Sequence, residues 1–535
     1  MSERFDAVTL EILWKRLVSA VDEASAALIR VAFSTVVRES YDFACVVTDT
    51  EGRLLAQATQ SIPSFIGTLP RTVRHFIDTV GLEAMRPGDV YVCNDPWRGT
   101  GHLSDINVAR PVFRDGTLVG FAASTAHAPD IGGRTGSLEM RDIFEEGFQI
   151  PALRLMRDGV VDQTLLALLR ANVRAPDEAV GDLYAQMSAL DIIEQRLMGL
   201  MDEYGLGELA SLAAEIHGRS EAAMRAAIAG VPPGTYRATM RPEGLATEVA
   251  FTIALTFGPE GLDVAFEAVT PQVDGMSLNS VYAYTFAYTC YGLKCILAPE
   301  LPNNDGLWRP VRLTAPEGSI LNHRYPTAGY RRHMLGHHLP VAVIAALSEA
   351  LPDRIIAATG GAPTWTIQQT GIDAEGKPYA NFLFFAGGIG AGSRHDGPSV
   401  LSWPSNISGV AVEYVEHLSP FRVHRKALRE GSGGAGMHRG GLGLDVELEV
   451  AETTPIHFAV SADRLRTGAA GAQGGAPGAP GEFLLNGAPA DPRVMYRLKT
   501  GDRVVLRTPG GGGFGLPASR STALAEHDAA EKYNG

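Results

Sequence analysis

The chain has 535 residues and a formal net charge of −14, with a mean hydropathy of +0.02 that is ordinary for a globular protein. No apolar run approaches the roughly 18 residues of a membrane span, and the acidic balance without clustered Lys and Arg argues against a nucleic-acid partner. The length suits about three domains or one large interlocked α+β body.

The N-terminus, Met1 to Asp6, lacks a basic flank followed by an apolar stretch, so we expect no secretory signal and predict a cytoplasmic protein. Cysteines are too few for a disulfide framework and lie in apolar surroundings. The sequence therefore predicts buried thiols at Cys45, Cys93, Cys290 and Cys295.

A long amphipathic helix is predicted from Asp6 to about Val36, where apolar residues recur at helical spacing without Pro or Gly. We expect it to be scaffold. Short apolar runs bounded by turn residues then predict strands at 43–48, 90–93, 106–113 and 118–124.

A second helical stretch is predicted from Gln186 to Ala229, and it resembles a hinge or spacer between two halves. Val231 to Gly234 ends it. Alternating runs at 249–255 and 264–268 then predict a hairpin around Gly258 to Gly261, which begins a second α+β region.

The C-terminal third is rich in glycine. The chain holds 60 glycines, about 11% against a typical ~7%. Tight corners and close backbone packing are favoured over phosphate binding, since no loop matches Gly-x-x-x-x-Gly-Lys-Ser/Thr or a dinucleotide fingerprint. Signatures of serine hydrolases, Cys-x-x-Cys redox proteins and His-Glu-x-x-His proteases are also missing from the sequence.

The predicted fold is α+β: a large multi-lobed body with a long N-terminal helix, mixed sheets and a glycine-rich, β-rich C-terminal region. We divide it into a metal-binding α+β region, a helical connector, a second α+β region and a glycine-rich β region, at residues 1–185, 186–230, 231–430 and 431–535.

Imidazoles and carboxylates gather between Asn94 and Gly133. His102 and Asp105 are three residues apart, so one turn can aim both at an ion, and His127 returns beside them at the end of an apolar strand. Such mixed ligands suit zinc, manganese or iron better than calcium or magnesium. The alternative is that these residues cap loops or face solvent.

The segment from Arg331 to His338 is a second cluster of cationic and imidazole side chains. His333 and His337 share a helix face, whereas His337 and His338 point in different directions. The segment is either a second metal or phosphate site, or a solvated first helical turn or interface.

The chain resembles the hydantoinase B/oxoprolinase family from near residue 6 to about residue 517. The motifs that carry this resemblance are Arg38 to Phe43, Asn94 to Pro96, His102-x-x-Asp105, His127-x-x-Asp130 with Ile131 to Gly133, Glu146-Gly147, Asn381 to Gly390, Asp396-Gly397, Ser432 to Gly436, Arg439 to Gly443 and Thr508 to Gly515.

The resemblance implies metal ligands at Asp42, His102, Asp105 and His127. Asp130 or Glu146 is then the catalytic base, or a group that orients a histidine ligand. The family's usual Gly-Gly-Thr-His-x-Pro-Asp reads Gly-Thr-Gly-His-Leu-Ser-Asp at 99–105: the ligand spacing is kept, but the backbone on the substrate side is expected to differ. The tail after Gly515 is short, which puts the C-terminal packing or subunit contacts of longer relatives in doubt.

The resemblance also implies a hydantoinase A-type partner with an actin-like ATPase fold, which uses ATP and magnesium. We expect a metal-dependent catalytic subunit of an ATP-dependent cyclic amidase that opens hydantoins, lactams or 5-oxoproline. The alternative is a subunit of an ATP-dependent ketone carboxylase of the acetone or acetophenone type, which needs the same ligands. A non-enzymatic assembly subunit is the third alternative.

Overall fold

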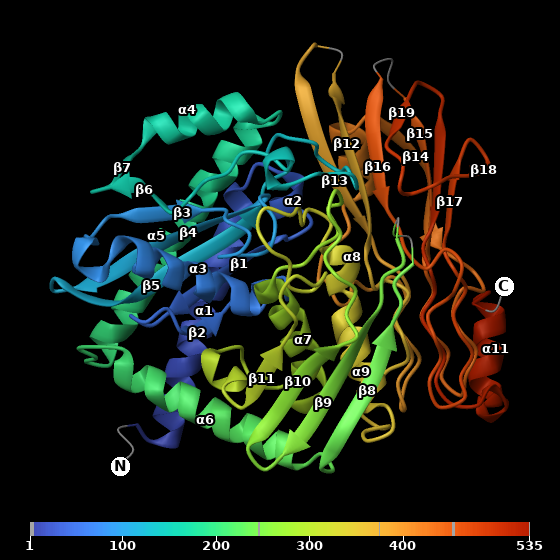
Figure 1. Cartoon of the computed structure of the whole chain (residues 1–535), viewed down its shortest axis with the longest axis horizontal. Coiled ribbons are helices and arrows are strands. Elements are labelled where there is room, and N and C mark those ends of the chain that lie inside the picture. Colours follow the sequence, from blue (N-terminus) through green and yellow to red (C-terminus); the bar gives the residue numbers. More distant parts are fainter. Residues whose placement is uncertain (1–4, 244, 246, 374, 452–454, 534–535) are drawn as a thin grey trace.

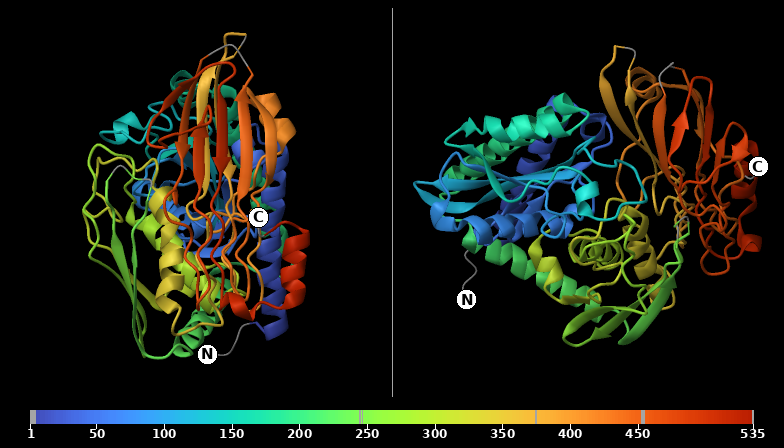
Figure 2. Two further views of the ribbon diagram at one scale, coloured as in Figure 1. Left: turned by 90° about the vertical axis from the view of Figure 1, so that its right-hand side faces the viewer. Right: turned by 45° about the horizontal axis from the view of Figure 1, so that its top comes forward.

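The computed structural model describes residues 5–243, 245, 247–373, 375–451 and 455–533. Its α+β architecture confirms the predicted fold class (Figure 1). The N-terminal region, the middle of the chain and the C-terminal sheets lie on three sides of a common centre (Figures 1 and 2). Within the described ranges, no helix combines the length and apolar composition that a membrane crossing requires.

The N-terminal region is built on an antiparallel sheet with strands of unequal length, in the order β2-β1-β5-β4-β3-β6-β7. Its strands are β1 Phe43–Thr48, β2 Leu54–Gln57, β3 Val90–Cys93, β4 Asp105–Arg114, β5 Thr117–His127, β6 Leu153–Arg157 and β7 Val160–Val161. The four predicted strands correspond to β1, β3, β4 and β5. Helices cover both faces of this sheet: α1 Ala7–Val31 and α5 Pro176–Glu203 on one, α3 Phe65–Val80 on the other.

Strand β1 shows why this sheet is buried on both faces. All its residues are buried, and they alternate between two cores: Phe43 and Cys45 join the core with α1 and α5, while Ala44 and Val46 join the core with α3. A strand covered on both sides reads as a continuous apolar run. This covering fixes the orientation of the strand ends that carry the candidate ligands.

The predicted opening helix ends earlier than expected. Asp6 caps α1 by accepting from the amides of Val8 and Thr9. The helix stops at Val31, and Ser34 caps a separate short helix, α2 Thr35–Arg38. A second capping residue therefore divides the run that apolar periodicity alone predicts as one helix.

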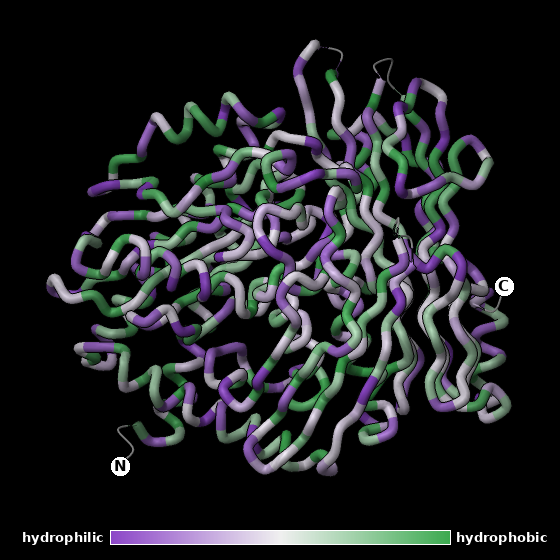
Figure 3. Tube along the Cα trace, viewed as in Figure 1, coloured by the Kyte–Doolittle hydropathy of each residue, from purple (hydrophilic) through white to green (hydrophobic). Residues whose placement is uncertain are grey.

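The predicted helix from Gln186 to Ala229 is also two helices, α5 and α6 Ala210–Ala229. The chain turns between them at Gly205, whose φ is +62°. Apolar residues of α5 and the first half of α6 belong to the core of the N-terminal region, and those at the end of α6 belong to the next core. Along α4 Gln163–Asn172 and α6, hydrophobic and hydrophilic residues alternate (Figure 3). Helices α5 and α6 therefore pack against the cores of both regions. The division into four domains stays a prediction.

The middle region contains the predicted hairpin, β9 Phe251–Gly258 with β10 Gly261–Glu267. It belongs to the sheet β11-β10-β9-β8. Buried residues of this sheet share one apolar core with those of two helices, α7 Tyr282–Leu297 and α9 His338–Leu347. The remaining bounds here are β8 Gly234–Met240, β11 Val311–Thr314 and α8 His333–Gly336.

The C-terminal region holds two sheets, β13-β12-β16-β19 and β14-β15-β20-β17-β18, which enclose one apolar core. Their strands are β12 Trp365–Ile372, β13 Pro378–Phe385, β14 Phe421–Leu428, β15 Leu444–Val450, β16 Ile456–Ser461, β17 Glu482–Leu485, β18 Ala488–Pro489, β19 Tyr496–Leu498 and β20 Arg503–Arg507. Short elements complete the chain: α10 Val412–Leu418, α11 Thr522–Ala530, and the 3-10 turns η1 Leu82–Ala84, η2 Ile143–Glu145, η3 Asp305–Trp308 and η4 Pro517–Ser519.

The glycine-rich segments run side by side below these sheets and are near neutral in hydropathy (Figures 1 and 3). Their backbones pair directly: Gly388 N donates to Pro509 O at 3.0 Å, and Gly511 N donates to Gly441 O at 2.9 Å. A Cβ on Gly388 would lie 1.9 Å from the Gly441 carbonyl oxygen. Glycine is therefore required at Gly388 because two backbones approach closely there. Close backbone packing is one of the two predicted reasons for the glycine content, and the other, a tight corner, does not apply at this position.

The cysteines are free thiols, as predicted. Cys45, Cys93 and Cys290 are buried, and Cys295 is partly buried.

Candidate metal centre

Three neighbouring strands bring candidate ligands to one edge of the N-terminal sheet. Asp105 begins β4 and His127 ends β5, and the antiparallel register pairs these two residues directly. Asp42 precedes β1, the other neighbour of β5, and its carbonyl oxygen accepts from the His127 amide at 3.0 Å. Residues far apart in sequence thus become cross-strand neighbours.

The loop between β3 and β4 carries His102 to the same edge. Asn94 holds this loop: its Nδ2 donates to Leu103 O at 2.8 Å, and its Oδ1 accepts from Ile150 N at 2.6 Å. Gly101 adopts a φ of +92°, a conformation that favours glycine, directly before the histidine.

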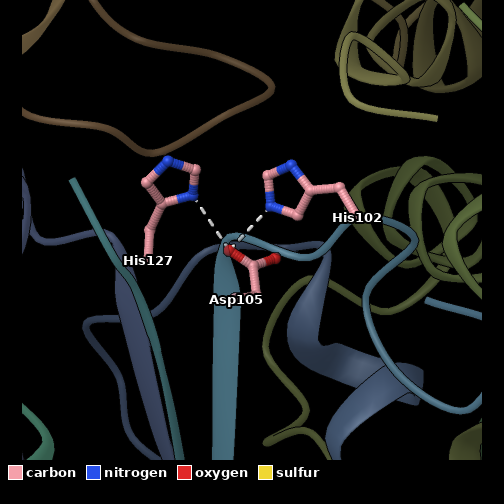
Figure 4. A group of neighbouring side chains, drawn as sticks. All are labelled: His102, Asp105 and His127. Carbon is pink, nitrogen blue, oxygen red and sulfur yellow. Dashed lines mark hydrogen bonds and ion pairs between the residues drawn. The ribbon is translucent and has the colours of Figure 1, made fainter. Parts of the chain in front are cut away.

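The three side chains converge on one point (Figure 4). Asp105 Oδ1 lies 2.8 Å from His102 Nε2 and 2.9 Å from His127 Nδ1. One ligand atom from each residue lies within 4.8 Å of the others, and all three residues are buried.

Arg332 anchors the other oxygen of the same carboxylate. Its Nη2 lies 3.0 Å from Asp105 Oδ2, its Nε donates to Thr100 O, and its guanidinium stacks 4.2 Å over the Tyr284 ring. Although burial opposes ionisation, His102, His127 and Arg332 hold the pKa of Asp105 well below its usual value. Asp105 is therefore a carboxylate in a fixed orientation.

Burial sets the charge of the neighbouring groups. It lowers the pKa of His102 to about 4, so this imidazole is neutral and its lone pair is available at neutral pH. Burial raises the pKa of Asp42 to about 6. Asp42 Oδ2 lies 3.9 Å from His127 Nδ1, beside the cluster of three.

A cavity of about 70 Å³ opens in front of these residues. All three regions of the chain line it. The polar part of the lining includes Tyr284, Tyr288, Arg331, Arg332, His333 and His337. The apolar part of the lining includes Ile62, Phe65, Phe382, Phe384 and Ile407. The space holds several waters or a small ring.

Residues 6–517 match the family model described as Hydantoinase B/oxoprolinase. The chain belongs to the hydantoinase B/oxoprolinase family. It is 28% identical to caprolactamase subunit beta of Pseudomonas jessenii, over 97% of this chain and 93% of that one. It is also 28% identical to 5-oxoprolinase 1 of Arabidopsis thaliana, over 95% of this chain but only 42% of that protein.

Solved structures agree with this membership. The ATP-dependent caprolactamase from Pseudomonas jessenii superposes with a TM-score of 0.91 at 27% identity, covering 99% of this chain and 94% of that chain. A nucleotide-free acetone carboxylase superposes with a TM-score of 0.86 at 20% identity, covering 99% of this chain and 78% of that chain. The second match shows the shared fold alone.

The second cluster predicted from the sequence is the segment from Arg331 to His338. Its predicted alternative, a solvated helical turn, is wrong because Arg331, His337 and His338 are buried. The two adjacent histidines do diverge: His337 Nε2 lies 3.0 Å from Tyr288 OH, and His338 Nε2 lies 2.7 Å from Asp463 Oδ2. The segment supplies part of the cavity lining.

The two carboxylates predicted as candidate catalytic bases, Asp130 and Glu146, make contacts outside the group of His102, Asp105 and His127. Asp130 is paired with Arg174 at 2.7 Å, and Glu146 accepts from the Gly329 amide at 2.6 Å and the Leu103 amide at 3.4 Å. Neither is among the described residues that line the cavity. Glu146 ties the His102 loop to the segment that carries Arg332, so its contacts fit a positioning role.

The residues present fit a divalent transition metal. Two imidazoles and a carboxylate form a donor set typical of zinc, manganese or iron sites. His102 Nε2 is buried and lies 2.8 Å from Asp105 Oδ1, the same oxygen that His127 Nδ1 approaches. The ligand atoms of the three residues are therefore already gathered around one point.

Sequence reasoning missed Tyr284 and Tyr288, and it placed Arg332 in a separate second cluster and not in this site. Arg332 lies 227 positions from Asp105, its ion-pair partner. No local pattern links them, because their proximity arises only when the middle region packs against the N-terminal sheet.

Proposed function

We propose that this chain is the metal-dependent catalytic subunit of an ATP-dependent cyclic amidase, which opens a hydantoin, lactam or 5-oxoproline-type ring. The observation that carries the proposal is the buried group of His102, Asp105 and His127 in the lining of a cavity. Membership of the hydantoinase B/oxoprolinase family supports it.

The proposal assigns ATP use to a separate hydantoinase A-type partner. This chain has no recognised phosphate-binding loop in its sequence, while the caprolactamase relative is named as a subunit of its enzyme and as ATP-dependent. The partner would phosphorylate the carbonyl oxygen of the cyclic amide, and this chain would receive the activated ring.

A zinc, manganese or iron ion held by His102, Asp105, His127 and Asp42 would lower the pKa of a bound water and stabilise a developing oxyanion. The chain's own residues prepare this chemistry. Arg332 keeps Asp105 ionised and oriented, and burial keeps His102 neutral. The apolar part of the lining, which includes Phe382 and Phe384, would hold the hydrocarbon part of a small ring and exclude bulk water.

Glu146 and Asp130 act in this proposal as positioning residues. Glu146 fixes the backbone of the His102 loop through Leu103, and Asp130 fixes residues 133–135 through Arg174 and Thr135. Besides Asp105, Asp42 is the carboxylate among the described residues that lines the cavity; its Oδ2 lies 3.9 Å from His127 Nδ1, and we assign it as the fourth ligand.

Cyclic amide hydrolysis is favoured over ketone carboxylation by the extent of the matches. The chain covers 93% of caprolactamase subunit beta and 78% of the acetone carboxylase chain. The carboxylase chain thus carries a larger part without a counterpart here.

The deciding experiment is turnover by the complex purified with its ATPase partner. Hydantoins, lactams, 5-oxoproline and ketones are assayed with and without ATP and with and without bicarbonate. We expect ATP-dependent ring opening that is independent of bicarbonate. Turnover of ketones alone, only with bicarbonate, would refute the amidase proposal in favour of the carboxylase.

Metal dependence is tested separately by elemental analysis. The wild-type chain is expected to hold one divalent transition metal, and a His102→Ala, His127→Ala double variant to hold none. Full metal content in the double variant would show that these residues are not the site.

A further inference from the structure

Arg331 differs from the other buried arginines of this chain. Within the described residues the buried arginines are Arg110, Arg331, Arg332 and Arg439. Three of them form ion pairs with carboxylates: Arg110 with Asp191 and Glu194, Arg332 with Asp105, and Arg439 with Asp528. The Nη2 atom of Arg331 instead donates to a neutral acceptor, Gly136 O at 2.6 Å, and among the described residues no carboxylate pairs with it.

A buried guanidinium without a counter-charge is costly. Desolvation of an ion costs several kcal/mol in a protein interior, and a nearby anion is what normally offsets it. Burial lowers the pKa of Arg331 to about 10, which still leaves it charged at neutral pH. The side chain is therefore a fixed positive charge that lacks its partner.

Arg331 and Gly136 lie where two cavities meet. Both residues line the cavity of the candidate metal centre and also a second, larger pocket of about 600 Å³. The lining of the second pocket also includes Arg134, Arg174 and Arg493. Each of these three is paired with a carboxylate, of Glu145, Asp130 and Asp491 respectively, whereas Arg331 has no carboxylate partner among the described residues.

A second polar atom in the inner cavity also lacks a partner. His333 lines the same cavity as Arg331, and its Nε2 is buried without a hydrogen-bond partner among the described residues. Burial, together with His337, holds the pKa of His333 well below its usual value. His333 is therefore a neutral imidazole that can donate one hydrogen bond into the cavity.

We propose that Arg331, with His333 beside it, binds the phosphoryl group of the activated substrate at the junction of the two cavities. The proposal rests on the proposed function, which supplies a phosphorylated ring. A planar guanidinium offers parallel N–H donors that match phosphoryl oxygens. The anion would supply the counter-charge that Arg331 lacks, while the apolar part of the lining takes the uncharged ring.

Inorganic phosphate is the probe for this site. The full chain is stripped of metal with a chelator, so that phosphate cannot bind to an ion, and is titrated with phosphate by calorimetry and by its effect on the thermal midpoint. We expect phosphate to raise the midpoint of the wild type. Arg331→Gln should bind phosphate at least about tenfold more weakly, since a charge-assisted hydrogen bond is lost, and Arg331→Lys should lie between them.

Arg493→Gln is the matched control. It removes the same charge from the same outer pocket at an exposed position, and its affinity for phosphate should stay within about threefold of the wild type. Without phosphate, Arg331→Gln should melt no lower than the wild type, because an unpaired buried charge is lost. If that variant does not fold, Arg331→Lys and the wild-type titration still decide the matter.

Three results would overturn the inference. They are no phosphate binding by the metal-free wild type, equal binding by the wild type and Arg331→Gln, and binding of acetate in preference to phosphate. None of them bears on the proposed function, which is decided by ATP-dependent ring opening in the complex.

Discussion

Lowering the pH should weaken metal binding to this chain through Asp42, because a carboxylate ligand must lose its proton before it binds. Burial raises the pKa of Asp42 to about 6 in the metal-free chain. The ionised fraction is then about nine-tenths at pH 7 and about one-tenth at pH 5. The metal-bound state holds fewer protons than the metal-free state, so this part of the affinity is present above pH 6 and is lost below it, by roughly tenfold or 1.4 kcal/mol between pH 7 and pH 5.

His102 should contribute little to this slope. Burial lowers its pKa to about 4, so it is already neutral throughout the pH window. Asp42→Asn is the control, because the amide keeps the shape of the side chain but has no proton to lose. The variant should bind metal more weakly at pH 7, yet lose about tenfold less affinity than the wild type between pH 7 and pH 5.

The assay is competition of the metal-free chain with a chelator of known pH dependence at pH 5, 6, 7 and 8. Calorimetry in buffers of different ionisation enthalpy counts the protons released, and at pH 5 the wild type should release about one proton more than Asp42→Asn. Equal pH slopes for the two proteins would refute the assignment of Asp42 as a ligand and the reasoning from its burial.

Three further predictions concern the scaffold and the partner. Arg332→Gln should weaken metal binding about 10-fold to 100-fold in chelator competition, since Arg332 orients Asp105; unchanged affinity would contradict this. Gly388→Ala should lower the free energy of unfolding by about 3 kcal/mol or more, because its Cβ would meet Gly441 O at 1.9 Å. The control is Gly199→Ala in α5, which has open space around it and should raise the free energy of unfolding by about 0.5–1 kcal/mol. Similar denaturant midpoints for the two variants would count against close backbone packing. The isolated chain should show no micromolar ATP binding by calorimetry, since its sequence has no recognised phosphate-binding loop; such binding would assign the glycine-rich segments a nucleotide role.

The sequence by itself determined the features that depend on neighbouring residues. Apolar periodicity and turn residues predicted the opening helix, the strands β1, β3, β4 and β5 and the β9–β10 hairpin, because these elements satisfy their backbone hydrogen bonds locally or with the next strand. His102-x-x-Asp105 and the returning His127 were recognised for a similar reason: β4 and β5 are consecutive strands, and antiparallel pairing brings their ends together.

Tertiary structure alone decided the remainder of the site. Arg332 reaches Asp105 from the middle region, and the C-terminal sheets add Phe382 and Phe384 to the cavity wall. In the same packing Glu146 accepts from a backbone amide of the middle region, and it is not among the described residues that line the cavity. Contacts between distant segments depend on which faces of each region bury one another, and that is decided by shape and apolar area summed over many residues and by no single motif.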